Sequence, residues 1–241
     1  MKIIWTLLVL LSFVGELRAA DWSETNIQYL QGSNYLRPNT DRYSQSLITV
    51  EHISGWAYGN NFFFFDIQSP DTQDKTVTYG EISPAFSLGK MDLVRVKDRF
   101  VKDILLQLNL EFPTGPARRA NLSGVTIEWQ NLWFDYLATQ FLYRDVLGVE
   151  GTSQQLTIVW SKVFGPSNWP IRFNGFLDWT GAEGHMRENL QMQPSLLLDL
   201  AKKTNNKVPL RIGMEYNFWQ NKYGIRGLNQ SVPQFKAVWI F

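Results

Sequence analysis

Apolar and polar residues alternate one by one in several separate runs of this 241-residue chain. The clearest runs span 103–112, 189–200 and 210–219. A period of two places successive side chains on opposite faces of a β-strand, whereas a helix would repeat every three to four residues. We therefore expect an all-β protein whose strands have one apolar and one polar face.

The first 19 residues have the pattern of a secretory signal peptide. Lys2 precedes the apolar run Ile3–Leu11, and small residues follow at Ala19 and Ala20. We predict cleavage near Ala19 or Ala20, which leaves residues 20–241 as a single domain.

The last strand of an exported chain with this pattern is informative. Phe235, Ala237 and Trp239 alternate before the terminal Phe241. A strand that turns aromatic and apolar residues towards lipid is typical of a barrel in the bacterial outer membrane. We expect Phe241 to be recognised by the outer-membrane assembly machinery. The alternative is a soluble secreted β-sandwich.

Composition supports the barrel and excludes several classes of function. Loss of Lys2, Arg18 and Glu16 with the signal leaves 21 of 23 basic and 21 of 22 acidic residues, a balance that does not favour nucleic-acid binding. The chain has no cysteine, so disulfides and thiolate metal sites are absent. Aromatic residues make up 15% of the chain, which suits a barrel with aromatic girdles.

Turn signals divide the mature chain into twelve segments, an even number as expected of a single-chain bacterial barrel. Prolines such as Pro194 and Pro233 fall inside these segments, where each removes one ladder hydrogen bond. The predicted strands are 21–32, 46–59, 61–69, 76–89, 101–113, 124–131, 134–145, 153–164, 170–181, 187–201, 207–221 and 231–241.

An ordered set of segments resembles the Tsx/OmpK family of nucleoside-specific outer-membrane channels, in its OmpK-like branch. The segments are Val50–Asp66, Tyr79–Pro84, Phe134–Leu137, Tyr143–Asp145, Gly175–Trp179, Gln193–Asp199 and Glu215–Tyr216. The resemblance implies a monomeric twelve-stranded barrel with a narrow lumen through which nucleosides diffuse. Ala138 and Leu142 depart from the family, because more polar or aromatic inward residues are usual there.

Strand parity gives the residues that we expect to face the lumen. If Phe63 and Phe65 face lipid, their neighbours Phe62 and Phe64 point inwards. Aromatic faces stack on planar bases and carboxylates accept hydrogen bonds from hydroxyl and amino groups, which suits a neutral polar solute. The candidate lumen residues are Glu51, Phe62, Phe64, Asp66, Tyr79, Glu81, Arg144, Arg172, Phe176, Asp178, Arg211, Glu215 and Trp219.

Other interpretations stay open at this point. The inward charges can equally be struts that pair across a small lumen. A barrel with a plugged lumen could act in adhesion through outer loops such as 33–45. An enzyme is disfavoured, because His52 falls on the lipid-facing parity and His185 in a link, and no catalytic residue, metal ligand set or cofactor motif is found.

Overall fold

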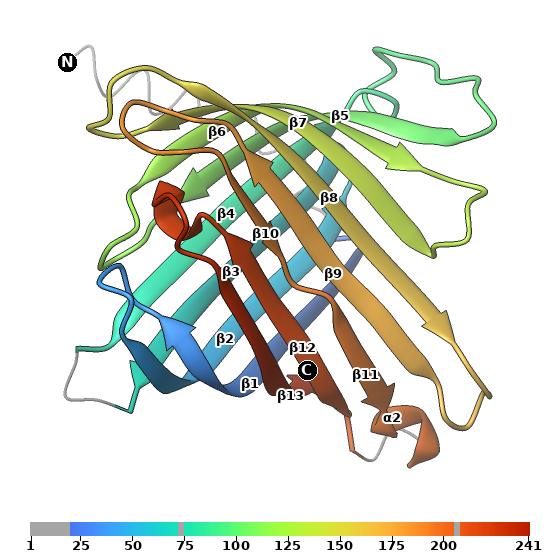
Figure 1. Ribbon diagram of the computed structural model, residues 1–241. Helices are drawn as coiled ribbons and strands as arrows, with labels where there is room; N and C mark the ends of the chain where they lie inside the picture. The colour runs from blue at the N-terminus through green and yellow to red at the C-terminus, as the bar shows by residue number, and fades with distance from the viewer. Residues whose placement is uncertain (1–19, 72–74, 205–207) are drawn as a thin grey trace, which may run out of the picture.

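The alternating segments form a closed ring of antiparallel strands in the computed structural model (Figure 1). The structure describes residues 20–71, 75–204 and 208–241, so the predicted signal peptide lies outside the described residues. The strands are β1 (Trp22–Leu36), β2 (Arg42–Trp56), β3 (Gly59–Pro70), β4 (Val77–Ser87), β5 (Val101–Glu111), β6 (Ala120–Trp129), β7 (Tyr136–Val146), β8 (Ser153–Phe164), β9 (Ile171–Thr180), β10 (Asn189–Met192), β11 (Ser195–Asp199), β12 (Leu210–Gln220) and β13 (Gln230–Ile240). Two short helical turns accompany them, α2 (Leu200–Lys203) and the 3-10 turn η1 (Lys222–Gly224).

The ring has no free edge. β1 pairs with β2 on one side and with β13 on the other, with Ile27 opposite Trp239. β10 and β11 both pair with β9 and β12, so they are two halves of one interrupted strand. The prediction of a twelve-stranded antiparallel barrel is therefore confirmed. Closure satisfies the backbone groups that an open sheet would leave unpaired in lipid.

The outer surface carries the apolar residues of the alternating runs. Large apolar side chains are exposed on consecutive strands, among them Ile48, Phe63, Phe65, Leu106, Leu108, Phe141, Leu196, Met214 and Phe235. Aromatic residues are exposed near both ends of the strands, Tyr58, Trp133, Phe164 and Trp239 at one end and Phe112, Tyr143, Trp179 and Tyr216 at the other. An apolar belt between two aromatic girdles is the surface of a transmembrane barrel. None of the helices in the described residues has the length and apolar character needed to cross a membrane.

The two ends of the barrel are named here by the chain termini. The terminal end is where β1 begins and β13 ends, and it includes α2, at the lower right in Figure 1. The distal end includes η1, at the left in Figure 1. The longest link of the described chain between two strands, residues 88–100, lies at the terminal end.

Part of the interior is filled by apolar side chains. Ala120, Leu122, Leu142 and Val146 form a buried cluster between β6 and β7. Gly124 lies on the same inner face, where a Cβ atom would stand 2.0 Å from the backbone oxygen of Phe141. The barrel wall therefore needs glycine at this close approach of two strands.

Several predicted boundaries are wrong. β6 begins at Ala120 rather than at 124, because Ala120 pairs with both Glu111 and Val146. The link predicted at 33–45 is shorter, since β1 and β2 continue past a bulge to Leu36 and Arg42.

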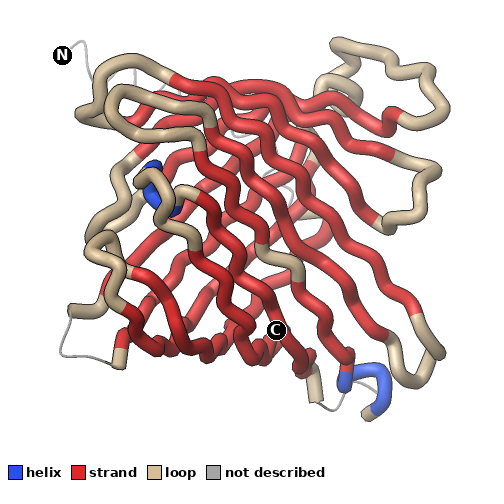
Figure 2. Tube along the Cα trace, viewed as in Figure 1, coloured by secondary structure: helices blue, strands red, loops and turns tan. Residues whose placement is uncertain are grey.

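The predicted strand 187–201 is not continuous. It is interrupted between Met192 and Ser195 and ends in α2, with Asp199 capping the helix through a hydrogen bond from the Ala201 amide at 3.0 Å. Figure 2 shows the interruption as a short loop-coloured stretch between two strand segments. Pro194 explains it, because proline has no amide hydrogen to donate to the ladder.

Candidate functional site

Cross-strand pairing places all thirteen predicted lumen residues on the inner face of the barrel. Directly paired residues share a face, so each residue follows from a neighbour: Glu51 lies opposite Phe64, and Phe64 opposite Glu81. The set divides among β2 (Glu51), β3 (Phe62, Phe64, Asp66), β4 (Tyr79, Glu81), β7 (Arg144), β9 (Arg172, Phe176, Asp178) and β12 (Arg211, Glu215, Trp219).

The inner faces of β2, β3 and β4 form one continuous surface, which we call the acidic–aromatic wall: Glu51, Phe62, Phe64, Asp66, Tyr79 and Glu81. The rings of Phe62 and Phe64 lie 5.7 Å apart, and those of Phe64 and Tyr79 lie 5.6 Å apart. All six side chains are half-buried although they point into the barrel. Space therefore remains in the lumen beside this wall.

The three carboxylates of the wall accept hydrogen bonds from neutral groups. The Asn26 amide donates to Glu51 at 3.0 Å, and the Thr49 hydroxyl donates to Asp66 at 2.6 Å. The Ser83 hydroxyl donates to Glu81 at 2.6 Å. Within the described part of the chain, none of the three carboxylates forms an ion pair. Each keeps acceptor capacity for a group in the lumen.

Two other predicted residues form ion pairs on the inner face of the barrel, outside the acidic–aromatic wall. Arg144 on β7 binds Glu111 of β5 through two hydrogen bonds of 2.5 and 2.8 Å and also donates to Gln155 at 3.0 Å. Glu215 on β12 accepts from Lys236 of β13 at 2.6 Å and from Ser195 at 2.9 Å. The Lys236–Glu215 pair links two neighbouring strands, whereas the Arg144–Glu111 pair reaches from β7 to β5 past β6. Losing one partner of either pair would leave a buried charge alone.

Residues at the terminal end form a second network. Arg211 binds the two carboxylate oxygens of Glu24 at 3.0 and 3.2 Å and lies 3.5 Å from Asp199. Arg172 donates to the Ser161 hydroxyl at 3.0 Å. The predicted residues Arg172 and Arg211 thus line the terminal mouth, away from the acidic–aromatic wall.

Of the remaining three predicted residues, two lie on the wall opposite β3 and the third lies on β12. In a ring of twelve strands β9 is six strands from β3, so Phe176 and Asp178 face the acidic–aromatic wall across the lumen. Asp178 accepts a hydrogen bond from Thr157 at 2.5 Å. Trp219 of β12 donates from its indole nitrogen to Asn189 at 3.1 Å.

Parity alone does not reveal Lys222, which is the most buried basic residue of the distal end. Its Nζ donates to the Leu36 carbonyl at 2.9 Å and to Gln230 at 2.7 Å, and it lies over the rings of Trp219 and Tyr223. Burial lowers the pKa of Lys222 to about 7. Lys222 joins the 221–229 link to β1 and fixes that link against the distal mouth.

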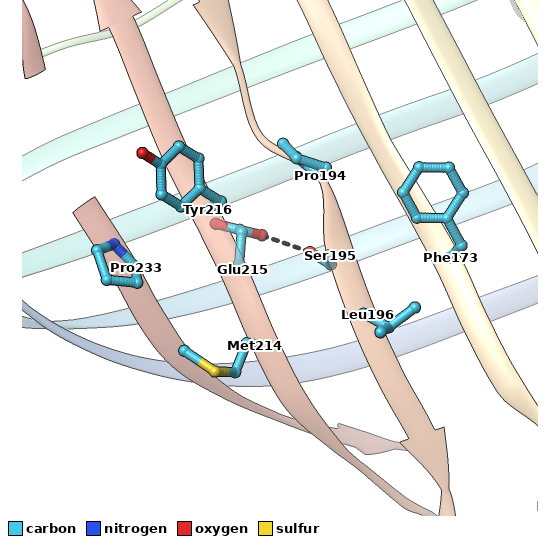
Figure 3. Close-up of a pocket in the computed structure, with 8 residues that line it drawn as sticks. All are labelled: Phe173, Pro194, Ser195, Leu196, Met214, Glu215, Tyr216 and Pro233. Carbon is cyan, nitrogen blue, oxygen red and sulfur yellow. Dashed lines mark hydrogen bonds between the residues drawn. The ribbon is translucent and has the colours of Figure 1, made fainter. Parts of the chain in front are cut away.

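The interrupted strand leaves a hollow of about 360 Å³ in the barrel wall (Figure 3). Phe173, Leu196, Met214 and Tyr216 surround it, all on the outward parity of their strands. The hydrogen bond between Ser195 and Glu215 lies behind these side chains in the wall. The hollow therefore faces lipid and is not part of the lumen.

Among the described residues, neither histidine belongs to an arrangement of the kind that catalytic sites use. His52 lies on the outward parity, stacks on Phe63 at 5.1 Å and is hydrogen-bonded to Thr25 at 2.8 Å. No group of three or more His, Cys, Asp or Glu residues in the described ranges is arranged to hold a metal ion.

A closed barrel with an apolar outer belt and a largely polar inner face is a bacterial outer-membrane β-barrel. The chain belongs to the family described as "Domain of unknown function (DUF5020)", whose model matches residues 24–241. No curated protein is significantly similar to it in sequence.

Two solved structures share the fold. One is a KdgM porin, with a TM-score of 0.53 and 9% identity over 90% of this chain and 99% of that chain. The other is a KdgM porin in complex with disordered oligogalacturonate, with a TM-score of 0.52 and 10% identity over the same shares of the two chains. Identities this low concern the fold alone, and the shared fold is a closed outer-membrane β-barrel.

Proposed function

We propose that this chain is a channel through which nucleosides, or similar small and neutral polar solutes, diffuse passively across the outer membrane. The observation that carries the proposal is the acidic–aromatic wall. Its three neighbouring rings offer faces on which a planar base stacks, and Phe176 adds a ring on the opposite wall.

The carboxylates of the wall favour the polar half of such a solute. Glu51, Asp66 and Glu81 accept hydrogen bonds, so they suit the hydroxyl groups of a ribose and the amino groups of a base. The same carboxylates repel phosphate groups and acidic sugars. The proposal therefore differs from the KdgM porin, whose oligogalacturonate is a chain of carboxylated sugars.

The ordered segments that resemble the Tsx/OmpK family support the nucleoside part of the proposal. Passive movement needs binding that is strong enough to admit the solute and weak enough to release it. No energy source or cofactor is required for this mechanism.

Single-channel recording in a planar bilayer tests the proposal. We expect purified barrel to conduct ions and a nucleoside to interrupt the current reversibly, whereas its monophosphate should interrupt it less. A well-folded barrel that conducts no ions would instead support a plugged barrel acting through its outer loops. If the barrel conducts ions but nucleosides do not interrupt the current, the protein would be a channel for another solute.

A further inference from the structure

The basic side chains of the inner face are largely neutralised by partners. Arg144 and Lys236 each form a close ion pair, with Glu111 and Glu215 respectively. Arg211 at the terminal mouth is shared between Glu24 and Asp199. These positive charges therefore contribute little field to the lumen.

The two inward basic residues that form no ion pair with a described residue lie towards the ends of the barrel. Arg172 is the second residue of β9, at the terminal end. Lys222 is at the distal end and only 3% exposed, with its ammonium group directed at carbonyl oxygens and aromatic rings. Neither residue faces the carboxylates of the acidic–aromatic wall as a direct partner.

The acidic residues are distributed differently. Glu51, Asp66 and Glu81 are half-buried, lie on three adjacent strands and accept hydrogen bonds from uncharged groups alone. On the opposite wall Asp178 likewise accepts from the Thr157 hydroxyl. In the part of the lumen between the terminal-end network and Lys222, acidic residues on the inner face outnumber basic ones by six to two. The acidic residues are Glu51, Asp66, Glu81, Glu111, Asp178 and Glu215, and the basic residues are Arg144 and Lys236.

We infer that the lumen is selective for cations, so that among charged solutes it passes small cations and excludes anions. A narrow aqueous path between low-dielectric walls concentrates the field of unpaired carboxylates and raises the local concentration of counter-ions. Carboxylate side chains lining a pore select cations by this means. The inference rests on the proposed function, since selectivity requires an open path.

Reversal potentials in a KCl gradient test the inference, with wild-type barrel at pH 9, far above the ordinary pKa of a carboxyl group. We expect K⁺ to be about tenfold more permeant than Cl⁻ at low ionic strength, the lower end of the concentrating effect of a charged cleft. The preference should weaken at high salt, because mobile ions screen the wall.

Variants locate the source of the selectivity. Glu51→Gln, Asp66→Asn and Glu81→Gln together should bring the permeability ratio close to one. The matched control is Asp145→Asn, which removes a carboxylate from the exposed outer face of β7 and should leave the ratio unchanged. If the triple variant does not assemble, each single variant should still lower the ratio.

The outcomes separate this inference from the proposed function. A conducting wild-type barrel that passes both ions equally, or prefers Cl⁻, would overturn the inference alone. A conducting, cation-selective barrel whose ratio survives the triple substitution would overturn the assignment to these carboxylates. A barrel with no conductance would overturn the inference and the proposed function together.

Discussion

Individual inward side chains have two distinct roles in this barrel, and their partners distinguish them. Arg144 and Glu215 are held by charged neighbours, so their first role is to join strands. Phe62 contacts Phe64, which also contacts Tyr79, and both phenylalanines keep exposed surface towards the lumen. The aromatic residues are therefore the better candidates for solute contact.

Truncation of this aromatic pair should weaken solute binding without unfolding the barrel. If each ring contributes ~1–3 kcal/mol of stacking, Phe62→Ala with Phe64→Ala should reduce nucleoside block by an order of magnitude or more. Open-channel conductance should stay equal or rise, because the substitution removes bulk from the lumen.

The same strand provides the control for the aromatic pair. Phe63→Ala with Phe65→Ala removes two rings from the outer face of β3, where both are exposed to lipid. We expect nucleoside block to be unchanged in this variant. Equal loss of block in both double variants would mean that β3 acts through its stability rather than through the lumen.

Lys222 should make the stability of the barrel depend on pH. Its pKa is about 7 in the folded barrel and 10.5 in an ordinary environment, so between these values the unfolded chain binds more protons. Stability should rise with pH across this window, by up to about 1.4 kcal/mol per pH unit, and the cost of the buried charge is fully present below pH 7. Lys222→Met should flatten the slope, which thermal unfolding in detergent from pH 7 to 10 measures.

At the scale of the strands, the sequence predicts the architecture better than the boundaries. Turn signals together with recurring period-two alternation identify all twelve segments, because one face must meet lipid and the other must not. The number of residues in a hairpin link is set by pairing partners that alternation does not reveal, which is why β6 was placed four residues late. The break at Pro194 was visible as a proline, but its position relative to β9 and β12 depends on register.

For the candidate site too, the sequence predicts which face a residue lies on but not which residues it contacts. Parity placed every predicted residue on the inner face, since direction alternates along each strand. Parity does not show which charges meet, so Glu111 as the partner of Arg144 was missed. The burial of Lys222 was missed for another reason, because the residue lies in a link where no alternation applies.

A lysine substituted on the outer face and another on the inner face of the barrel test the assignment of faces directly. Leu106→Lys, at the centre of β5 on the lipid-facing side, should cost ~2–4 kcal/mol of unfolding free energy. Gln140→Lys, half-buried on the inner face of β7, should cost much less. Unfolding in urea from lipid vesicles compares the two, and similar losses would show that the assignment of faces is wrong.

At the scale of the whole molecule, the last strand completes the barrel. β13 pairs with both β12 and β1, and the amide of Phe241 donates to the Thr25 carbonyl at 2.9 Å. The Phe241 side chain itself is 72% exposed, so its packing contributes little to the stability of the closed barrel. An aromatic side chain that the fold hardly uses is available for recognition during assembly.

We expect deletion of Phe241, or Phe241→Asp, to leave the chain unassembled in the periplasm of cells that produce it. We expect the cause to be loss of a signal for the outer-membrane assembly machinery rather than loss of stability. Heat-modifiable mobility on gels of membrane fractions measures assembly. Refolding in detergent, where no machinery is present, is the control: the deleted chain should fold there as the wild-type chain does. Normal assembly in cells would remove Phe241 as the signal, and failure in detergent as well would assign the defect to strand closure.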